Sequence, residues 1–194
     1  MPESTRNWNS KALRCGCWGV VDPDTGRADA VAREFGCKAF GSVHQMLTTH
    51  SELQAASVAA PTVQHLNVAG ELMRAGVDVL IEKPLAASLA EAEELVALAA
   101  KHKRIAQVGH LERFNPAVRA TVPLLTQPMF FEVHRLSVFT PRSLDVDVVL
   151  DLMIHDLDIV LAFAKSPVKE VRAVGLPILS GKVDHQIEHY IHIE

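Results

Sequence analysis

Long hydrophobic runs are missing from this chain of 194 residues: none approaches the roughly 20 residues that a membrane-spanning helix needs. The polar start, residues 1–10, lacks the apolar core of a signal peptide. Positive charge is not in excess, because the formal net charge is −4, so nothing electrostatic favours a nucleic-acid partner. These absences predict a cytoplasmic protein that binds neither membrane nor nucleic acid.

Cysteine is also scarce, and the three residues are Cys15, Cys17 and Cys37. An odd number suits reduced thiols better than a disulfide framework. The single residue between Cys15 and Cys17 is too short a spacing for a zinc knuckle, and no second pair follows. We therefore expect no metal site.

Hydrophobic residues make up 48% of the chain, and short strand patterns alternate with helical ones. This alternation predicts an α/β fold with a parallel sheet covered by helices on both faces. Residues 1–109 would form an incomplete Rossmann-type domain, and residues 110–194 part of an α+β domain with a mostly antiparallel sheet. Strands are expected at 18–21, 55–60, 79–81, 105–108, 129–139 and 168–176, and helices at 24–35, 42–49, 63–75, 88–102 and 151–164, the last largely buried.

Two short patterns carry chemistry. The strand at 79–81 delivers Glu82 and Lys83 to its carboxyl end, where ligands bind in open α/β sheets and a partly desolvated lysine can exchange protons. A surface Glu-Lys pair is the alternative. Asp151 and His155 are four residues apart on one helix face, so the acid can orient the imidazole and raise its basicity. A capping or salt-bridged pair is the alternative there.

The runs Glu82-Lys83-Pro84, Gly109-His-Leu-Glu-Arg-Phe-Asn-Pro116 and Asp151-Leu-Met-Ile-His155 occur in one order. Together they resemble the Gfo/Idh/MocA family of nicotinamide-dependent sugar oxidoreductases, most of all its members of the UDP-N-acetylglucosamine 3-dehydrogenase type. The resemblance covers residues 20–181 or thereabouts. It implies that Lys83, Asp151 and His155 are the catalytic lysine, aspartate and histidine. It also implies a sugar or nucleotide-sugar substrate and a homo-oligomer.

The expected cofactor is NAD. Asp22 ends a strand just before a helix, where a dinucleotide-binding fold holds ribose hydroxyls, and its carboxylate would repel the 2′-phosphate of NADP. A helix-leading Asp in an Asp-Pro-Asp turn is the alternative. Position and resemblance together give the cofactor-binding set Asp22, Ala60, Pro61, Thr62, His65, Glu82 and Lys83. Thr62 would also initiate its helix without any cofactor.

Substrate contacts are expected from the segment after the last parallel strand, at His110, Arg113 and Asn115. The guanidinium of Arg113 could hold a phosphate or a sugar hydroxyl. A surface arginine near a helix start is an equal alternative.

A glycine-rich phosphate loop should precede Asp22 by about twenty residues. Residues 1–15 contain no glycine, and Gly16 and Gly19 lie too close to the strand before Asp22 to cradle a pyrophosphate. The chain is therefore expected to be truncated, or to have lost phosphate binding. Its end, residues 185–194, departs from the family's sheet strands and is expected to be an unrelated tail rather than a metal site.

The expected reaction is oxidation of a sugar hydroxyl by hydride transfer to NAD⁺. His155 or Lys83 would accept the hydroxyl proton, Asp151 would orient His155, and Glu82 would help to place the nicotinamide. A non-catalytic remnant or binding protein of the same family is one alternative. A metal-dependent hydrolase built on His155 and nearby acids is another.

Overall fold

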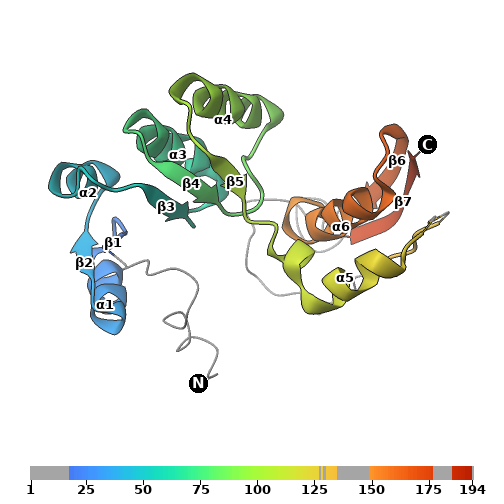
Figure 1. The fold of residues 1–194 in the computed structure, drawn as a ribbon, viewed down its shortest axis with the longest axis horizontal. Helices are drawn as coiled ribbons and strands as arrows, with labels where there is room; N and C mark the ends of the chain where they lie inside the picture. Colours follow the sequence, from blue (N-terminus) through green and yellow to red (C-terminus); the bar gives the residue numbers. More distant parts are fainter. Residues whose placement is uncertain (1–17, 127, 129, 135–148, 177–184, 194) are drawn as a thin grey trace. The chain divides into compact units, whose positions relative to one another are not determined.

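The computed structural model describes residues 18–126, 128, 130–134, 149–176 and 185–193. The chain divides into two units, Met1–Leu53 and Gln54–Glu194 (Figure 1). Cys15, Gly16 and Cys17 lie outside the described residues. The domain boundary expected near Gly109 stays a prediction.

The first unit is a small parallel sheet whose two strands are joined by a helix (Figure 1). Its elements are β1 (Gly19–Val21), α1 (Thr25–Phe35), β2 (Lys38–Phe40) and α2 (Val43–Thr49). Helix α1 begins where the side chain of Asp24 accepts the backbone N–H of Arg27, and it ends at Gly36 with a φ of 68°. The expected strand and two helices are confirmed here.

The second unit begins with three parallel strands in the order β3-β4-β5. Its first elements are β3 (Ala55–Val58), η2 (Thr62–Gln64), α3 (His65–Arg74), β4 (Asp78–Ile81), α4 (Leu89–His102) and β5 (Ala106–Val108). The strands advance in one direction across the sheet, so two right-handed crossovers place α3 and α4 on the same side (Figure 1).

Within the second unit both helices lie on one face of the sheet, and the expectation of helices on both faces of the whole parallel sheet stays a prediction. On β4, Val79 and Ile81 are buried beneath the two helices, whereas Leu80, which points to the other face, is 38% exposed. The parallel α/β class itself is confirmed.

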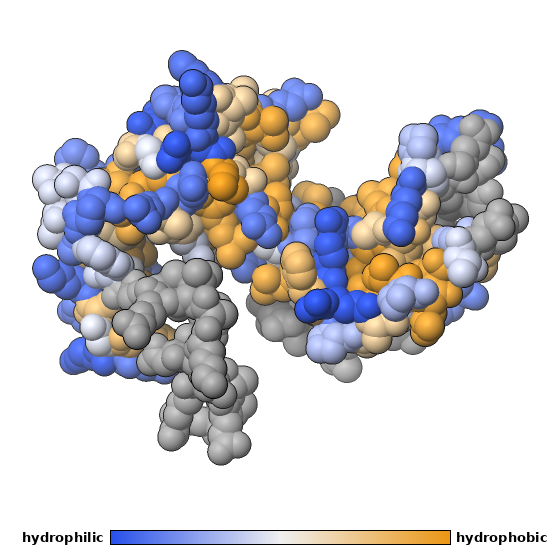
Figure 2. Space-filling view, viewed as in Figure 1, coloured by the Kyte–Doolittle hydropathy of each residue, from blue (hydrophilic) through white to orange (hydrophobic). Residues whose placement is uncertain are grey.

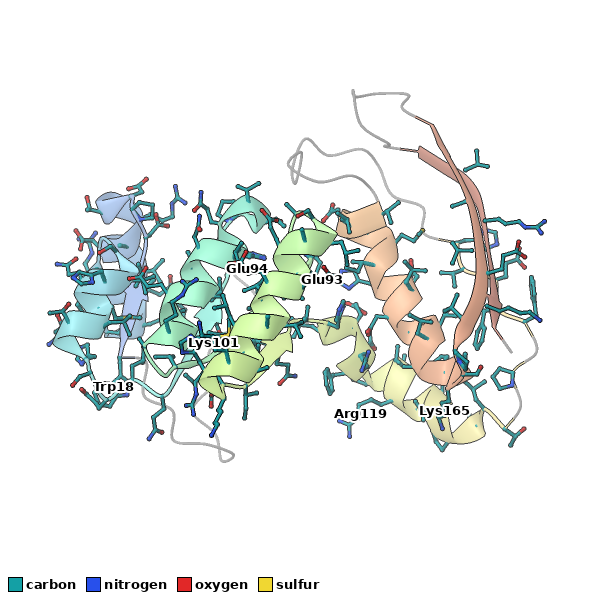
Figure 3. All side chains as sticks on the ribbon, turned by 90° about the horizontal axis from the view of Figure 1, so that it is seen from above. Trp18, Glu93, Glu94, Lys101, Arg119 and Lys165 are labelled. Carbon is teal, nitrogen blue, oxygen red and sulfur yellow. The ribbon has the colours of Figure 1, made fainter. Side chains whose placement is uncertain are left out.

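Helices α3 and α4 form the core together with the strands. The fully buried side chains include Met73 of α3, Ile81 of β4 and Leu95 of α4. Helix α4 is capped by Ser88, whose side chain accepts the N–H of Glu91, and it occupies the range that the sequence predicts. Its outer face is charged: Figure 3 shows Glu93, Glu94 and Lys101 on the side away from the sheet.

The remainder of the second unit is helical and then antiparallel. Its elements are η3 (Leu111–Phe114), α5 (Pro116–Thr121), η4 (Val122–Leu124), the π-helical turn η5 (Val149–Met153), α6 (Ile154–Ala164), β6 (Val168–Leu176) and β7 (His185–Ile193). Strands β6 and β7 pair antiparallel, which confirms an antiparallel sheet in this part. No helix within the described ranges is long and apolar enough to cross a membrane.

Three expectations about this part differ from the structure. Residues 130–134 form no strand, because no described strand pairs with them; residues 129 and 135–139 lie outside the described residues. Helix α6 is half-buried rather than largely buried, with Leu161 42% exposed, and Figure 2 shows apolar side chains at the surface in this part. The end of the chain forms a strand that the sequence analysis does not expect: residues 185–193 are β7 and pair with β6. The expectation that this end is unrelated to the family stays a prediction.

Replacement of the buried Leu95 by alanine should lower the free energy of unfolding by about 2–5 kcal/mol, because it leaves a cavity between α4 and the sheet. Val96, the next residue, is 63% exposed, and its replacement by alanine should change that free energy by less than about 0.5 kcal/mol. Urea unfolding followed by circular dichroism measures both. Equal losses for the two variants would contradict the packing described.

Candidate active site

The carboxyl ends of β3, β4 and β5 lie side by side. Val58, Ile81 and Val108 occupy one register across the three strands. The backbone N–H of Glu82 donates to Val58 O at 2.9 Å, and that of Gly109 donates to Ile81 O at 2.7 Å. The segments that follow the three strands therefore share one edge of the sheet, the edge at which open α/β folds bind ligands.

Lys83 forms the principal long-range contact of this edge. Its Nζ donates to the carboxylate Oδ1 of Asp151 at 2.8 Å and to the backbone O of the same residue at 2.7 Å. Both side chains are largely enclosed, with 20% and 23% of their surfaces exposed. The ammonium of Lys83 thus pairs with the carboxylate of Asp151 and also donates to the backbone carbonyl of the same residue. Two of the three predicted catalytic residues are therefore in direct contact.

Asp151 does not lie in the α-helix that its spacing from His155 predicts. Residues Val149–Met153 form a π-helical turn, and α6 begins at Ile154. A π-turn widens the helix and displaces carbonyls from their usual partners, and such turns are frequent at functional sites. Lys83 supplies a donor to the carbonyl of Asp151 in this turn. His155 follows in the first turn of α6.

Glu82 lies against the strand end beside it. A Cβ added to Gly109 would come within 3.3 Å of the Glu82 carboxyl group, so the absence of a side chain at residue 109 makes room for this carboxylate. The backbone N–H of Lys83 donates to Glu82 Oε2 at 3.3 Å. Glu82 therefore lies beside Gly109 and accepts one backbone hydrogen bond there.

His65 is buried and ties two loops together. Its Nε2 lies 2.9 Å from Ala60 O, and its Nδ1 lies 3.0 Å from Pro84 O. Only 1% of the residue is exposed. The imidazole thus joins the turn after β3 to the turn after β4. A contact of this side chain with a cofactor stays a prediction.

The turn after β3 brings Ala60 and Pro61 to the same edge. Pro61 is exposed, whereas Thr62 is 7% exposed and starts η2. Asp22 belongs to the first unit, at the carboxyl end of β1. Its carboxylate accepts the N–H of Asp24 at 2.9 Å and lies 3.3 Å from the guanidinium of Arg27. The acid therefore occupies the expected strand end. The cationic side chain of Arg27 lies beside it, which the sequence analysis did not predict.

The three predicted substrate residues have different surroundings. Arg113 donates through Nε to Asp158 Oδ2 at 2.9 Å and through Nη2 to Asp158 Oδ1, and this hydrogen bonding raises the pKa of Arg113. Asn115 caps α5 by accepting the N–H of Ala117, and its amide donates to Glu112. Within the part of the chain that the structure describes, His110 Nδ1 is buried without a hydrogen-bond partner. Of the three residues, His110 alone presents an unused buried polar atom.

The described residues contain no cluster of three or more His, Cys, Asp or Glu side chains that could hold a metal ion. The side chains of the terminal histidines, residues 185, 189 and 192, lie outside what the structure describes. The prediction that they form no metal site stays a prediction.

Comparisons with known proteins identify the family and the fold. Residues 2–110 match the model of the Gfo/Idh/MocA oxidoreductase family, which has an NAD-binding Rossmann fold. UDP-N-acetylglucosamine 3-dehydrogenase of Acidithiobacillus ferrooxidans is 41% identical over 167 residues, which are 86% of this chain and 52% of that protein. An inositol 2-dehydrogenase of Leifsonia xyli is 33% identical over 159 residues, 78% of this chain and 47% of that protein.

Solved structures show the same fold. The fold is similar to that of UDP-N-acetylglucosamine 3-dehydrogenase from Acidithiobacillus ferrooxidans, with a TM-score of 0.81 at 39% identity over 90% of this chain and 55% of that one. GenD2 of gentamicin A biosynthesis, solved in complex with NAD, shares the fold with a TM-score of 0.72 at 22% identity, over 91% of this chain and 54% of that one. The chain spans about half the length of the relatives it matches.

Replacement of Lys83 by methionine should lower the free energy of unfolding by about 1–3 kcal/mol, because it leaves the carboxylate and the carbonyl of Asp151 without their donor. Lys101 provides the matched control: it is exposed on α4 (Figure 3), and the described residues offer it no ion pair. Its replacement by methionine should leave stability within about 0.5 kcal/mol. Urea midpoints that do not distinguish the two variants would contradict the role of the Lys83–Asp151 contact.

Proposed function

Because the chain belongs to the Gfo/Idh/MocA oxidoreductase family, with its NAD-binding Rossmann fold, we propose that its protein oxidises a hydroxyl group of a sugar or nucleotide-sugar with NAD⁺. The observation that carries this proposal is the contact between Lys83 and Asp151 at the carboxyl end of β4. It joins the ligand-binding edge of a parallel sheet to the helix that bears His155. The names of the relatives that match, both dehydrogenases of hydroxylated rings, support the substrate class.

We propose that residues at the strand ends bind the dinucleotide. Asp22 offers a carboxylate to ribose hydroxyls at the end of β1, and the turn at Ala60 and Pro61 offers a surface without charged side chains at the end of β3. At the end of β4, Glu82 lies over the bare backbone of Gly109. NAD⁺, when bound, would accept the hydride from the carbon that bears the hydroxyl group. We propose NAD rather than NADP, because the family model is an NAD-binding fold and the carboxylate of Asp22 would repel a 2′-phosphate, a repulsion that Arg27, 3.3 Å away, would reduce.

The chain's own residues would move the proton. As the hydroxyl carbon loses its hydride and becomes a carbonyl, the hydroxyl proton must pass to a base. His155 or Lys83 would take it. Lys83 in its charged state, held by Asp151, would instead polarise the hydroxyl oxygen, and in that case His155 is the base. Asp151 would orient both residues, and the unused Nδ1 of His110 would contact a substrate hydroxyl.

Two further features belong to the proposal. A division of the chain at residue 109 would separate cofactor binding from substrate binding, and it coincides with the end of the family match at residue 110. Association into a homo-oligomer would follow the family's pattern, and light scattering of the purified protein measures it.

Titration of the purified protein with NAD⁺ and NADH by calorimetry tests the cofactor. We expect a dissociation constant of about 1 μM to 1 mM, the range in which KM values of enzymes usually lie, and weaker binding of NADPH. A folded protein that binds neither NAD⁺ nor NADH at millimolar concentration would contradict the proposal and would favour a non-catalytic remnant of the family.

Turnover with a panel of nucleotide-sugars, followed by NADH absorbance, tests the catalytic residues. Replacement of Lys83 or His155 by alanine should lower kcat by about 10²–10⁴-fold, because each would remove an acid–base group. Lys101→Ala is the control that should keep normal turnover, since Lys101 is on the outer face of α4. A variant at residue 83 or 155 with near-normal kcat would remove that residue from the mechanism.

A further inference from the structure

The ion pair between Arg113 and Asp158 joins two segments that flank the candidate active site. Arg113 lies in η3, directly after β5, and Asp158 lies in α6. The two hydrogen bonds of the guanidinium reach both carboxylate oxygens, the paired geometry that makes such contacts strong and directional. The side chain of Asp158 is only 9% exposed, whereas that of Arg113 is 50% exposed.

The carboxylate of Asp158 depends on this arginine. A buried charge is costly unless a partner compensates it, and loss of one partner leaves the other uncompensated. Because the carboxylate side chain is 9% exposed and the guanidinium side chain 50% exposed, the acid has less access to water than the arginine when the pair is broken. A guanidinium committed to both oxygens of a buried acid also has less capacity left for a phosphate.

The pair has a counterpart two turns earlier. Asp151 is bonded to Lys83 after β4, and Asp158 is bonded to Arg113 after β5. His155 lies between the two acids in the sequence, four residues after the first and three before the second. The helical segment that bears His155 is therefore fastened to two neighbouring strand ends, once on each side of the histidine.

The rest of the segment after β5 is organised in the same way. Asn115 caps α5 and donates to Glu112 at 3.1 Å, so both ends of its amide are used within the segment. Such internal bonds fix the backbone around Arg113. These bonds suggest that the side chains of this segment hold α6 in place and do not bind a ligand.

We propose that Arg113 is a positioning residue: through Asp158 it fixes α6, and with it His155, at the carboxyl edge of the sheet. It is not a ligand of the substrate phosphate. The role assigned to His155 rests on the proposed function, whereas the fastening of α6 by Arg113 does not.

Hydrogen exchange measured by mass spectrometry tests the fastening on the whole chain without any ligand. In Arg113→Gln, peptides that cover residues 154–164 should exchange about tenfold faster or more, because α6 loses its ion pair with the segment after β5. Arg119→Gln is the matched control: Arg119 is an exposed arginine on α5 that points away from α6 (Figure 3), and its exchange pattern should equal that of the wild type. Unchanged exchange of α6 in Arg113→Gln would overturn the proposal.

The double variant Arg113→Gln with Asp158→Asn distinguishes loss of the ion pair from a general loss of stability. Removal of both charges abolishes the uncompensated buried carboxylate, so α6 should regain part of the protection lost in the single variant. If Arg113→Gln does not fold, Arg113→Lys keeps the charge without the paired geometry and should show the faster exchange. A double variant no better protected than Arg113→Gln would count against the pair.

The effect on His155 needs a readout that general structural damage would not give. The imidazole resonance of His155, assigned by comparison with His155→Gln, should shift in Arg113→Gln and not in Arg119→Gln. In an active enzyme, Arg113→Gln should lower kcat with little change in KM for the nucleotide-sugar. A raised KM with unchanged kcat, or weaker binding of UDP with α6 fully protected, would instead make Arg113 a substrate ligand. Absence of turnover in the wild type would contradict the proposed function and leave the exchange result standing.

Discussion

The ammonium group of Lys83, shared between the carboxylate and the carbonyl of Asp151, is the contact on which the second unit depends. The two residues are 68 positions apart in the chain. Between them the chain forms a helix on one face of the sheet, the third parallel strand and the segment that leads to α6. The contact is satisfied only if β4 ends at Ile81 and the π-turn places Asp151 beside it. It thus relates a strand end to a distant helical segment through one side chain.

Ion pairs contribute more than usual to the placement of α6, because few of the described apolar side chains are buried around this helix. The fully buried side chains lie in α3, α4 and the strands, whereas no described residue of α6 is fully buried. Hydrophobic contacts stabilise without specifying a register, whereas an ammonium or guanidinium with two acceptors fixes distance and direction. The described surroundings of α6 therefore combine loose apolar packing with two directional ionic contacts. Such an arrangement defines the place of the helix more sharply than its burial alone would.

Local features of the fold could be predicted from the sequence, because they depend on neighbours in the chain. Asp24 and Gly36 delimit α1, and Ser88 with Glu91 starts α4, as capping chemistry requires. The strand end that carries Glu82 and Lys83 was predictable from a short run of branched apolar residues followed by proline.

Long-range features could not be predicted in the same way. The pattern around residues 129–139 indicates a strand, yet alternation makes a strand only where a partner exists, and residues 130–134 have none among the described strands. The terminal segment shows the converse, since β6 provides a partner for it. Asp151 was expected to serve His155, and nothing local to Asp151 reveals Lys83 as its partner. The ion pair of Arg113 with Asp158 also could not be predicted, because the two residues are 45 positions apart in the chain.

The π-turn at Val149–Met153 has a consequence for insertions and deletions. A π-turn accommodates one more residue per turn than an α-helix does, because its hydrogen bonds join residues five apart instead of four. Deletion of one residue of this turn other than Asp151 would leave a regular α-helical turn, so the segments before and after it would keep nearly the same relative orientation. Deletion of one residue in α6 between Ile154 and Asp158 would instead rotate Asp158 by about 100° relative to Asp151. The π-turn is therefore a place where the helical segment can lose a residue while its two acids still face Lys83 and Arg113.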